Sequence, residues 1–179
     1  MTDEKHAQQP SKRLFFALDC PPAQRKAIAQ WRGALGLRAG KPVPAANFHL
    51  TLLFLGAVPL AQISEVCEAA SNVRTSGEVL KISLDRLQVW HRAGVLSLAP
   101  EQAPPSLLRL VYALEQAMLP FGFEEVTREY RPHLTLARDY RAAEPEATTP
   151  PAFFLRAERF ALFESHKGQY RVLADWPLI

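Results

Sequence analysis

The sequence lacks long apolar runs, has little cysteine and carries little excess charge. No apolar stretch approaches the roughly 20 residues that a membrane-spanning helix needs, so we expect no membrane segment. The two cysteines, Cys20 and Cys67, form no CxxC pair, which argues against a disulfide framework, a zinc finger or a thioredoxin-type redox site. A net charge of only +3 is compatible with anionic partners but does not by itself indicate them.

The N-terminus also lacks the apolar core of a secretory signal. Its first thirteen residues are polar and mixed in charge, so we expect a cytoplasmic protein with a flexible tail over residues 1–12. With 179 residues, 48% of them hydrophobic and 22% charged, the chain has the balance of one globular domain. We place that domain at residues 13–179.

Strands and helices are mixed along the chain, which predicts an α+β fold with helices packed on sheet faces. Apolar runs and alternation predict strands over residues 14–18, 48–55, 80–84, 95–99, 133–137, 153–163 and 170–173. Apolar residues at helical spacing predict helices over residues 22–37, 60–73 and 105–118. A stretch rich in Ala, Glu, Thr and Pro over residues 142–151 predicts a surface loop.

The tetrapeptide His-Leu-Thr-Leu occurs twice, at residues 49–52 and 133–136. Composition predicts about 0.2 chance matches to His-x-Thr in this chain, and both matches fall in predicted strands. Since side chains alternate along a strand, each His shares one face with its Thr, and the leucines take the other face. If the two strands lie side by side, two imidazoles and two hydroxyls converge.

Two convergent histidines suit phosphodiester cleavage. With an ordinary pKa of about 6.5, one imidazole can accept a proton and the other can donate one near neutral pH. Two threonine hydroxyls can donate hydrogen bonds to the phosphate oxygens. This chemistry requires no metal and no cofactor. Two histidines without Asp, Glu or Cys at ligand spacing make a poor zinc site, and either motif alone is more often structural.

These motifs and their surroundings resemble the two-histidine phosphoesterase superfamily, in particular the bacterial LigT-like RNA 2′,3′-cyclic phosphodiesterases, also called 2′-5′ RNA ligases. The resemblance covers nearly the whole chain from Arg13. The matching segments are Arg13-Leu14-Phe15-Phe16-Ala17-Leu18, Asn47-Phe48-His49-Leu50-Thr51-Leu52 with Phe54-Leu55-Gly56, Pro120-Phe121-Gly122-Phe123, Arg131-Pro132-His133-Leu134-Thr135-Leu136-Ala137-Arg138 and Tyr170-Arg171-Val172-Leu173.

The resemblance implies a bilobal fold, in which two pseudo-symmetric lobes with antiparallel-rich sheets flank a central cleft. It implies that His49 is the general acid and His133 the general base, and that Thr51 and Thr135 hold the phosphate. Arg138 falls where the family has a phosphate-contacting arginine. Arg138 lies five residues after His133, and on a regular strand this odd spacing would place the two side chains on opposite faces. A bend or the end of the strand is therefore needed between them.

The sequence does not determine the roles of some residues or the exact function. Phe16 could stack on a base or belong to the core, and Trp90 could stack on a base or be structural. The roles of Trp90, His91 and His166 are undetermined. The resemblance implies RNA ends or nucleotides with a 2′,3′-cyclic phosphate as partners, and we expect a monomer. Reversible 2′-5′ ligation and a non-catalytic nucleotide-binding module are the alternatives to hydrolysis.

Overall fold

The computed structural model describes residues 9–123 and 129–179. Within these residues, the strands are β1 (Ser11–Asp19), β2 (Lys41–Pro42), β3 (His49–Pro59), β4 (Leu80–Leu84), β5 (Arg86–Trp90), β6 (Val95–Ala99), β7 (Leu134–Arg138), β8 (Phe153–Ala157), β9 (Arg159–His166) and β10 (Gln169–Pro177). The helices are α1 (Pro22–Ala34), α2 (Leu60–Ser71) and α3 (Pro105–Met118), with short 3-10 turns at η1 (Ala45–Asn47) and η2 (Leu119–Phe121). None of these helices is long and apolar enough to cross a membrane.

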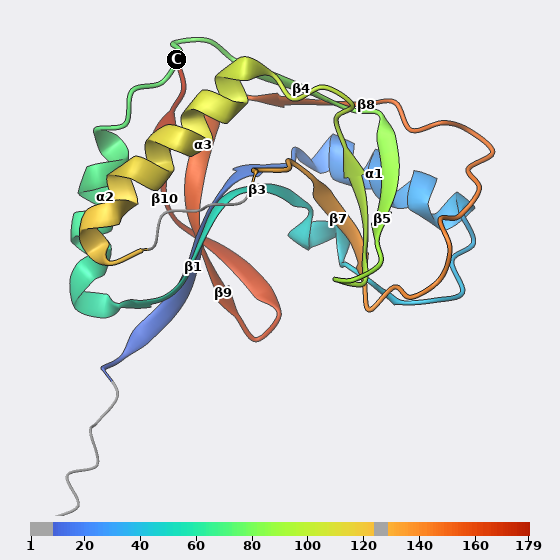
Figure 1. The fold of residues 1–179 in the computed structure, drawn as a ribbon, viewed down its shortest axis with the longest axis horizontal. Helices are drawn as coiled ribbons and strands as arrows, with labels where there is room; N and C mark the ends of the chain where they lie inside the picture. The colour runs from blue at the N-terminus through green and yellow to red at the C-terminus, as the bar shows by residue number, and fades with distance from the viewer. Residues whose placement is uncertain (1–8, 124–128) are drawn as a thin grey trace, which may run out of the picture.

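The strands form antiparallel sheets, as the α+β prediction requires (Figure 1). The first sheet has the order β10-β9-β1-β3, and the second has the order β2-β7-β6-β5. A separate two-stranded sheet, β4-β8, was not expected from the sequence. Helices α2 and α3 pack together and against β3, whereas α1 contacts η1 and β8. The fold is therefore two larger sheets with helices at both ends of the molecule.

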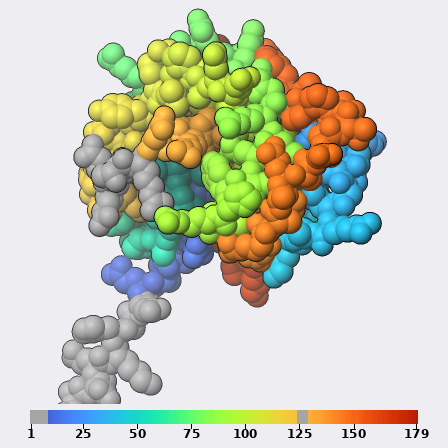
Figure 2. All heavy atoms as spheres, turned by 45° about the vertical axis from the view of Figure 1, so that its right-hand side comes forward, coloured from blue at the N-terminus to red at the C-terminus, as the bar shows by residue number. Residues whose placement is uncertain are grey.

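The two His-Leu-Thr-Leu motifs lie in equivalent places in two halves of the fold. In the first half β1 leads through α1 to β3, and β3 pairs antiparallel with β1. In the second half β6 leads through α3 to β7, and β7 pairs antiparallel with β6. The two motif strands thus belong to different sheets and are not hydrogen-bonded neighbours. They pack directly against each other. The space-filling view shows a hollow beside its light green atoms, with teal atoms at the floor of the hollow (Figure 2).

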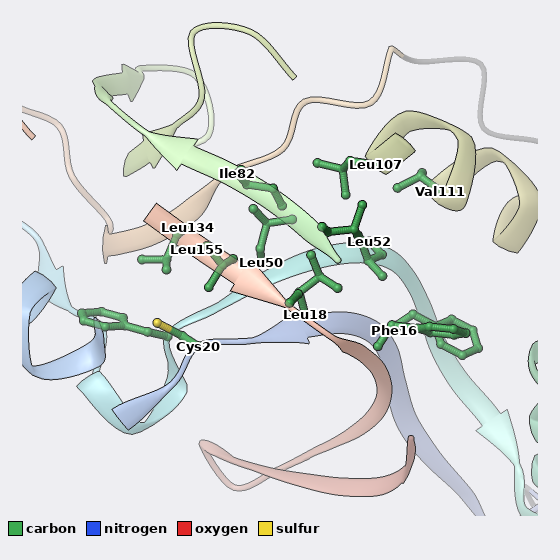
Figure 3. Close-up of a cluster of buried hydrophobic side chains, with 14 of the residues drawn as sticks. Phe16, Leu18, Cys20, Leu50, Leu52, Ile82, Leu107, Val111, Leu134 and Leu155 are labelled. Atoms are coloured by element: carbon green, nitrogen blue, oxygen red, sulfur yellow. The ribbon is translucent and has the colours of Figure 1, made fainter. Parts of the chain in front are cut away.

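The motif leucines fill the core between the two halves (Figure 3). Leu50, Leu52, Leu134 and Leu136 are all buried in one continuous cluster, as the alternation predicted. Burying a leucine stabilises the fold by about 1.5–3 kcal/mol relative to leaving it exposed. The same packing that holds the two halves together therefore turns the other face of each motif strand, the His-Thr face, toward the hollow.

Several predicted element boundaries differ from the structure. The strand predicted over residues 153–163 is split at Glu158 into β8 and β9, which belong to different sheets. The short strands β2 and β5 were not predicted: two residues are too few to show a period, and β5 follows β4 with only Asp85 between them. Strand β1 starts at Ser11, two residues before the predicted domain boundary, and residues 1–8 of the predicted tail lie outside the described residues.

Candidate active site

The histidine and threonine side chains of both motifs line one cavity of about 500 Å³. His49 and Thr51 reach it from β3, and His133, Thr135 and Arg138 reach it from β7 and the residue before it. We call it the phosphate cavity. All five site residues that the sequence indicated thus lie around one space, although their strands are in different sheets. The convergence comes from packing of the two sheets and not from strand pairing.

A β-bulge follows the threonine of each motif. Ala17 of β1 lies opposite Thr51 and Phe16 lies opposite Leu53, so Leu52 is an extra residue in β3. A bulge leaves one residue unmatched and shifts the side-chain alternation by one position. The residue that lies three positions after Thr51 therefore returns to the cavity face. That residue is Phe54, which lines the phosphate cavity.

The second motif strand has its bulge at the equivalent position. Ser97 of β6 lies opposite Thr135 and Leu96 lies opposite Ala137, so Leu136 is the extra residue. Leu136 and Ala137 are both fully buried, and Arg138 turns back to the face of Thr135. This resolves the odd offset of Arg138 that the sequence left unexplained. The bulge aims the guanidinium at the cavity, where a regular strand would point it into the core.

The bulge in β7 has dedicated hydrogen-bond donors. The backbone N–H of Val43 donates to the Leu136 carbonyl at 2.9 Å, and the Arg32 guanidinium of α1 donates to the same oxygen at 2.9 Å. Burial lowers the pKa of Arg32, whose guanidinium also lies over the Phe48 ring at 5.0 Å. Because a buried carbonyl without a partner is costly, these donors hold the bulge in place. No pattern in the sequence indicated this role of Arg32.

Both imidazoles are held by the same backbone contact. His49 Nδ1 donates to the Asn47 carbonyl at 2.7 Å, and His133 Nδ1 donates to the Arg131 carbonyl at 2.9 Å. A carbonyl only accepts, so each ring carries its proton on Nδ1 and has Nε2 available for proton transfer. Each acceptor lies two residues before its histidine. The two rings are therefore oriented by equivalent local geometry in the two halves.

The environment of His49 strongly disfavours its charged form. Its ring lies 4.8 Å from the Phe15 ring and 5.0 Å from the Tyr170 ring, between centroids. Desolvation by this burial is the main cause that lowers the pKa of His49 to about 4, and the positive charge of Arg138 lowers it further. Its Nε2 lies 2.9 Å from Thr51 Oγ1. In the neutral state the Thr51 hydroxyl therefore donates to Nε2.

His133 has a related but different environment. Its ring packs edge-on against Trp90, with 4.4 Å between ring centroids. Desolvation lowers the pKa of His133, and Arg138 contributes in the same direction. The sequence left the role of Trp90 open, and in the structure Trp90 packs against the ring of His133. Both histidines are therefore neutral in the free protein at pH 7, and an anion in the cavity favours protonation of either one.

Two further hydrogen bonds join the site to distant segments. The Asn47 side-chain amide donates to the Gly168 carbonyl in the β9–β10 turn at 3.0 Å, so the residue that orients His49 is itself anchored. The Tyr130 hydroxyl donates to the Thr51 carbonyl at 2.7 Å and connects the segment before β7 to β3. Neither contact was predicted, because the partners are far apart in sequence.

Phe16 does not line the cavity, so of the two roles that the sequence left open, base stacking and a place in the core, the structure supports the core. Its side chain is 0% exposed and packs against Phe160 and Trp176 at 6.4 and 6.1 Å between ring centroids. The neighbouring Phe15 faces the cavity instead. Both faces of β1 are apolar, so the alternation of the sequence could not show which phenylalanine points which way.

No cluster of three or more His, Cys, Asp or Glu side chains that could hold a metal ion is found among residues 9–123 and 129–179. The polar groups around the phosphate cavity include the two imidazoles, the two motif hydroxyls and two arginines, Arg13 and Arg138. Such a set can bind an anion, accept a proton from one oxygen and donate a proton to another.

The fold and the site together define a phosphoesterase of the two-histidine type. A family model described as LigT like Phosphoesterase matches residues 18–97 and 98–174, one match for each half of the fold. The chain belongs to this family of LigT-like phosphoesterases.

Named relatives agree with this assignment. The chain is 34% identical to the RNA 2′,3′-cyclic phosphodiesterase of Escherichia coli, over 93% of this chain and 97% of that protein. It is 31% identical to the RNA 2′,3′-cyclic phosphodiesterase of Thermus thermophilus, over 93% and 90% of the two chains. Among solved structures, it superposes on E. coli LigT complexed with 3′-AMP with a TM-score of 0.82 and 33% identity, covering 94% of this chain and 99% of that one.

Proposed function

We propose that this protein hydrolyses 2′,3′-cyclic phosphate ends of RNA to 2′-phosphomonoesters, without a metal. The observation that carries the proposal is the pair of Nε2 atoms, each left available by an Nδ1–carbonyl hydrogen bond, around one cavity with Arg138. Relatives of similar length carry the name of this activity. We also propose that residues 13–179 act as one bilobal domain, and that the protein is a cytoplasmic monomer.

In the proposed reaction, His133 Nε2 accepts a proton from water while the water oxygen forms a bond to phosphorus. The bond from phosphorus to O3′ breaks, and His49 Nε2 donates a proton to the departing O3′. One proton is taken up and one is released, so both histidines return to their starting states after an exchange with solvent. The low pKa of His49, about 4, makes its protonated form a strong acid for a poor leaving group.

Arg138 and the threonines would stabilise the charge on phosphorus. Arg138 is a permanent cation, and the hydroxyls of Thr51 and Thr135 are hydrogen-bond donors around the same cavity. When His49 is neutral, the Thr51 hydroxyl hydrogen points at Nε2. When His49 is protonated, Nε2 can no longer accept this hydrogen bond, so the Thr51 hydroxyl can donate to a phosphate oxygen while Nε2–H donates to O3′. Protonation of the acid thus prepares the phosphate site.

The test uses an oligoribonucleotide that ends in a 2′,3′-cyclic phosphate, incubated with the purified protein in excess EDTA. We expect conversion to the 2′-phosphate, and we expect His49→Ala and His133→Ala each to lower turnover by about 10²- to 10⁴-fold. Near-normal turnover in either variant would defeat the assignment of that histidine. Adding RNA with a 5′-hydroxyl to the same reaction distinguishes hydrolysis from ligation, because ligation yields a longer strand.

A further inference from the structure

A separate cavity of about 220 Å³ lies where α3 begins, at the end of the molecule that holds the C-terminus (Figure 1). Its lining comes from the segment after α2, from Leu80 of β4, from α3 and from Leu178 after β10. We call it the arginine cavity, because Arg74 and Arg109 line it. None of its lining residues also lines the phosphate cavity, so it is distinct from the site of the proposed reaction.

The two guanidiniums of this cavity have no acidic partner. Within residues 9–123 and 129–179, five other basic side chains form ion pairs with carboxylates, whereas Arg74 and Arg109 form neither an ion pair nor a hydrogen bond. The cavity lining includes no carboxylate, and the terminal carboxylate of Ile179 is not paired with either arginine. Like charges around one cavity repel each other, and an anion in the cavity offsets this repulsion. The arginine cavity therefore favours an anionic ligand.

Hydroxyl groups around the arginine cavity add hydrogen-bond donors. The Thr75 hydroxyl donates to the Leu178 carbonyl at 3.0 Å, which joins the segment after α2 to the end of the chain. The Ser76 hydroxyl oxygen accepts from the backbone N–H of Glu78 at 3.3 Å, so its own hydrogen is available to a ligand. The Ser106 hydroxyl forms no hydrogen bond in the described part of the chain. Two serine hydroxyls and two guanidiniums can thus donate to one oxyanion.

The first turn of α3 adds a backbone donor beside these side chains. Pro105 has no N–H, and the N–H groups of Leu107 and Leu108 both donate to the Pro104 carbonyl, at 3.1 and 3.3 Å. The N–H of Ser106 has no backbone acceptor among the residues that the structure describes. No acidic side chain lies in this turn. The positive end of the helix dipole therefore adds to the field of the two arginines.

We propose that the arginine cavity binds a phosphate group, carried either by an RNA strand or by a small phosphorylated molecule. Guanidiniums suit this group because their planar N–H donors match two phosphate oxygens at once. A volume of about 220 Å³ is below the roughly 300–1,000 Å³ of pockets that enclose a whole drug-sized ligand, so the cavity suits one small group. A bound phosphate group would join the segment after α2 to the start of α3. This site does not depend on the proposed hydrolysis.

The experiment titrates the isotope-labelled protein with sodium sulfate and follows the backbone amide signals by NMR. Sulfate is the probe because it is a divalent oxyanion of the shape of phosphate. We expect it to shift the signals of Ser76 and Ser106, which line the arginine cavity, with an affinity that differs from the one measured at Thr135 in the phosphate cavity. Because this measurement needs no turnover, its outcome is separate from that of the hydrolysis assay.

The variants Arg74→Ala and Arg109→Ala should each weaken the sulfate affinity measured at Ser106 by at least about tenfold, the effect of losing one charge-assisted hydrogen bond. The affinity measured at Thr135 should not change. Arg171→Ala is the matched control, because Arg171 is exposed on β10 and lines neither cavity. Sulfate that shifts Thr135 but not Ser106 would overturn the inference, and so would wild-type affinity at Ser106 in both variants.

Two further titrations distinguish the sources of the phosphate group. A single-stranded oligoribonucleotide that shifts the Ser106 signal, with an affinity that Arg109→Ala weakens, would assign the group to RNA. Ribose 5-phosphate that does so, while the oligoribonucleotide does not, would assign it to a small molecule. A response to sulfate without a response to either phosphate compound would identify an adventitious ion only and would overturn the inference.

Discussion

The environment of His49 predicts that an anion and a proton bind to the free enzyme together. Lowering the pKa of His49 from 6.5 to about 4 makes its protonation about 3 kcal/mol less favourable than in water. At pH 7 only about one molecule in a thousand then carries this proton. A divalent anion in the phosphate cavity opposes the causes of the shift, because it adds negative charge beside the imidazole and partly offsets Arg138. The pKa of His49 should therefore rise when the cavity is filled.

Sulfate is a suitable probe, because it keeps the same charge over the whole range from about pH 4 to pH 8. By linkage, the sulfate affinity should increase by up to about tenfold for each pH unit that lies between the pKa of His49 in the complex and in the free protein. Lowering the pH from 7 to 5 should thus strengthen binding by as much as about 100-fold for this one proton. The kcat/KM optimum should lie below pH 6.5, because the pKa values of both histidines are lowered in the free protein.

The assay combines calorimetry of sulfate binding with an NMR titration of the imidazole signals. In the His133→Ala variant, the pH dependence of binding reports His49 without the second histidine. His49→Ala should lose the part of the pH dependence that belongs to this proton, and His166→Ala is a control outside the cavity lining. A free-enzyme titration of His49 near pH 6.5, or sulfate affinity that does not change between pH 7 and pH 5, would refute this reasoning.

Two further predictions concern Arg138 and Phe16. Arg138→Ala should lower kcat/KM by about 10²- to 10³-fold, the effect of removing one group that stabilises developing charge. It should also raise the pKa of both histidines, since Arg138 lowers both, and NMR titration of the variant would show an unchanged midpoint if this cause is wrong. Phe16→Ala should lower the free energy of unfolding by about 3–5 kcal/mol, because it empties a fully buried site. Denaturant titration measures this loss, and a change in kcat of the folded variant larger than a few-fold would contradict a purely structural role.

Much of the site could be predicted from the sequence because strand alternation is a local property. The spacing of His49 and Thr51 puts both on one face of any regular strand, and Leu50 shows that the other face is buried. The repeat of the same pattern at His133 indicated that two such faces meet. The α+β class followed from mixed periodicities in the same way.

Other features depended on partners that lie far apart in the chain. The bulges at Leu52 and Leu136 arise from the register with β1 and β6, and no pattern within the motif shows that one residue is unmatched. Without those bulges, neither Phe54 nor Arg138 could be placed on the cavity face. The choice between Phe15 and Phe16 was likewise open, because β1 is covered on both faces.

The sequence by itself determined which atoms can do the chemistry: two imidazoles and two hydroxyls, each pair aimed to one side by a two-residue period. Tertiary structure decided how these atoms meet and how they titrate. Packing of two separate sheets brings the motifs around one cavity, and aromatic neighbours from β1 and β10 remove water from His49. The low pKa of His49 comes from burial by segments that are distant in the chain, so only the folded protein fixes it. The direction of Arg138 likewise depends on the register between β6 and β7.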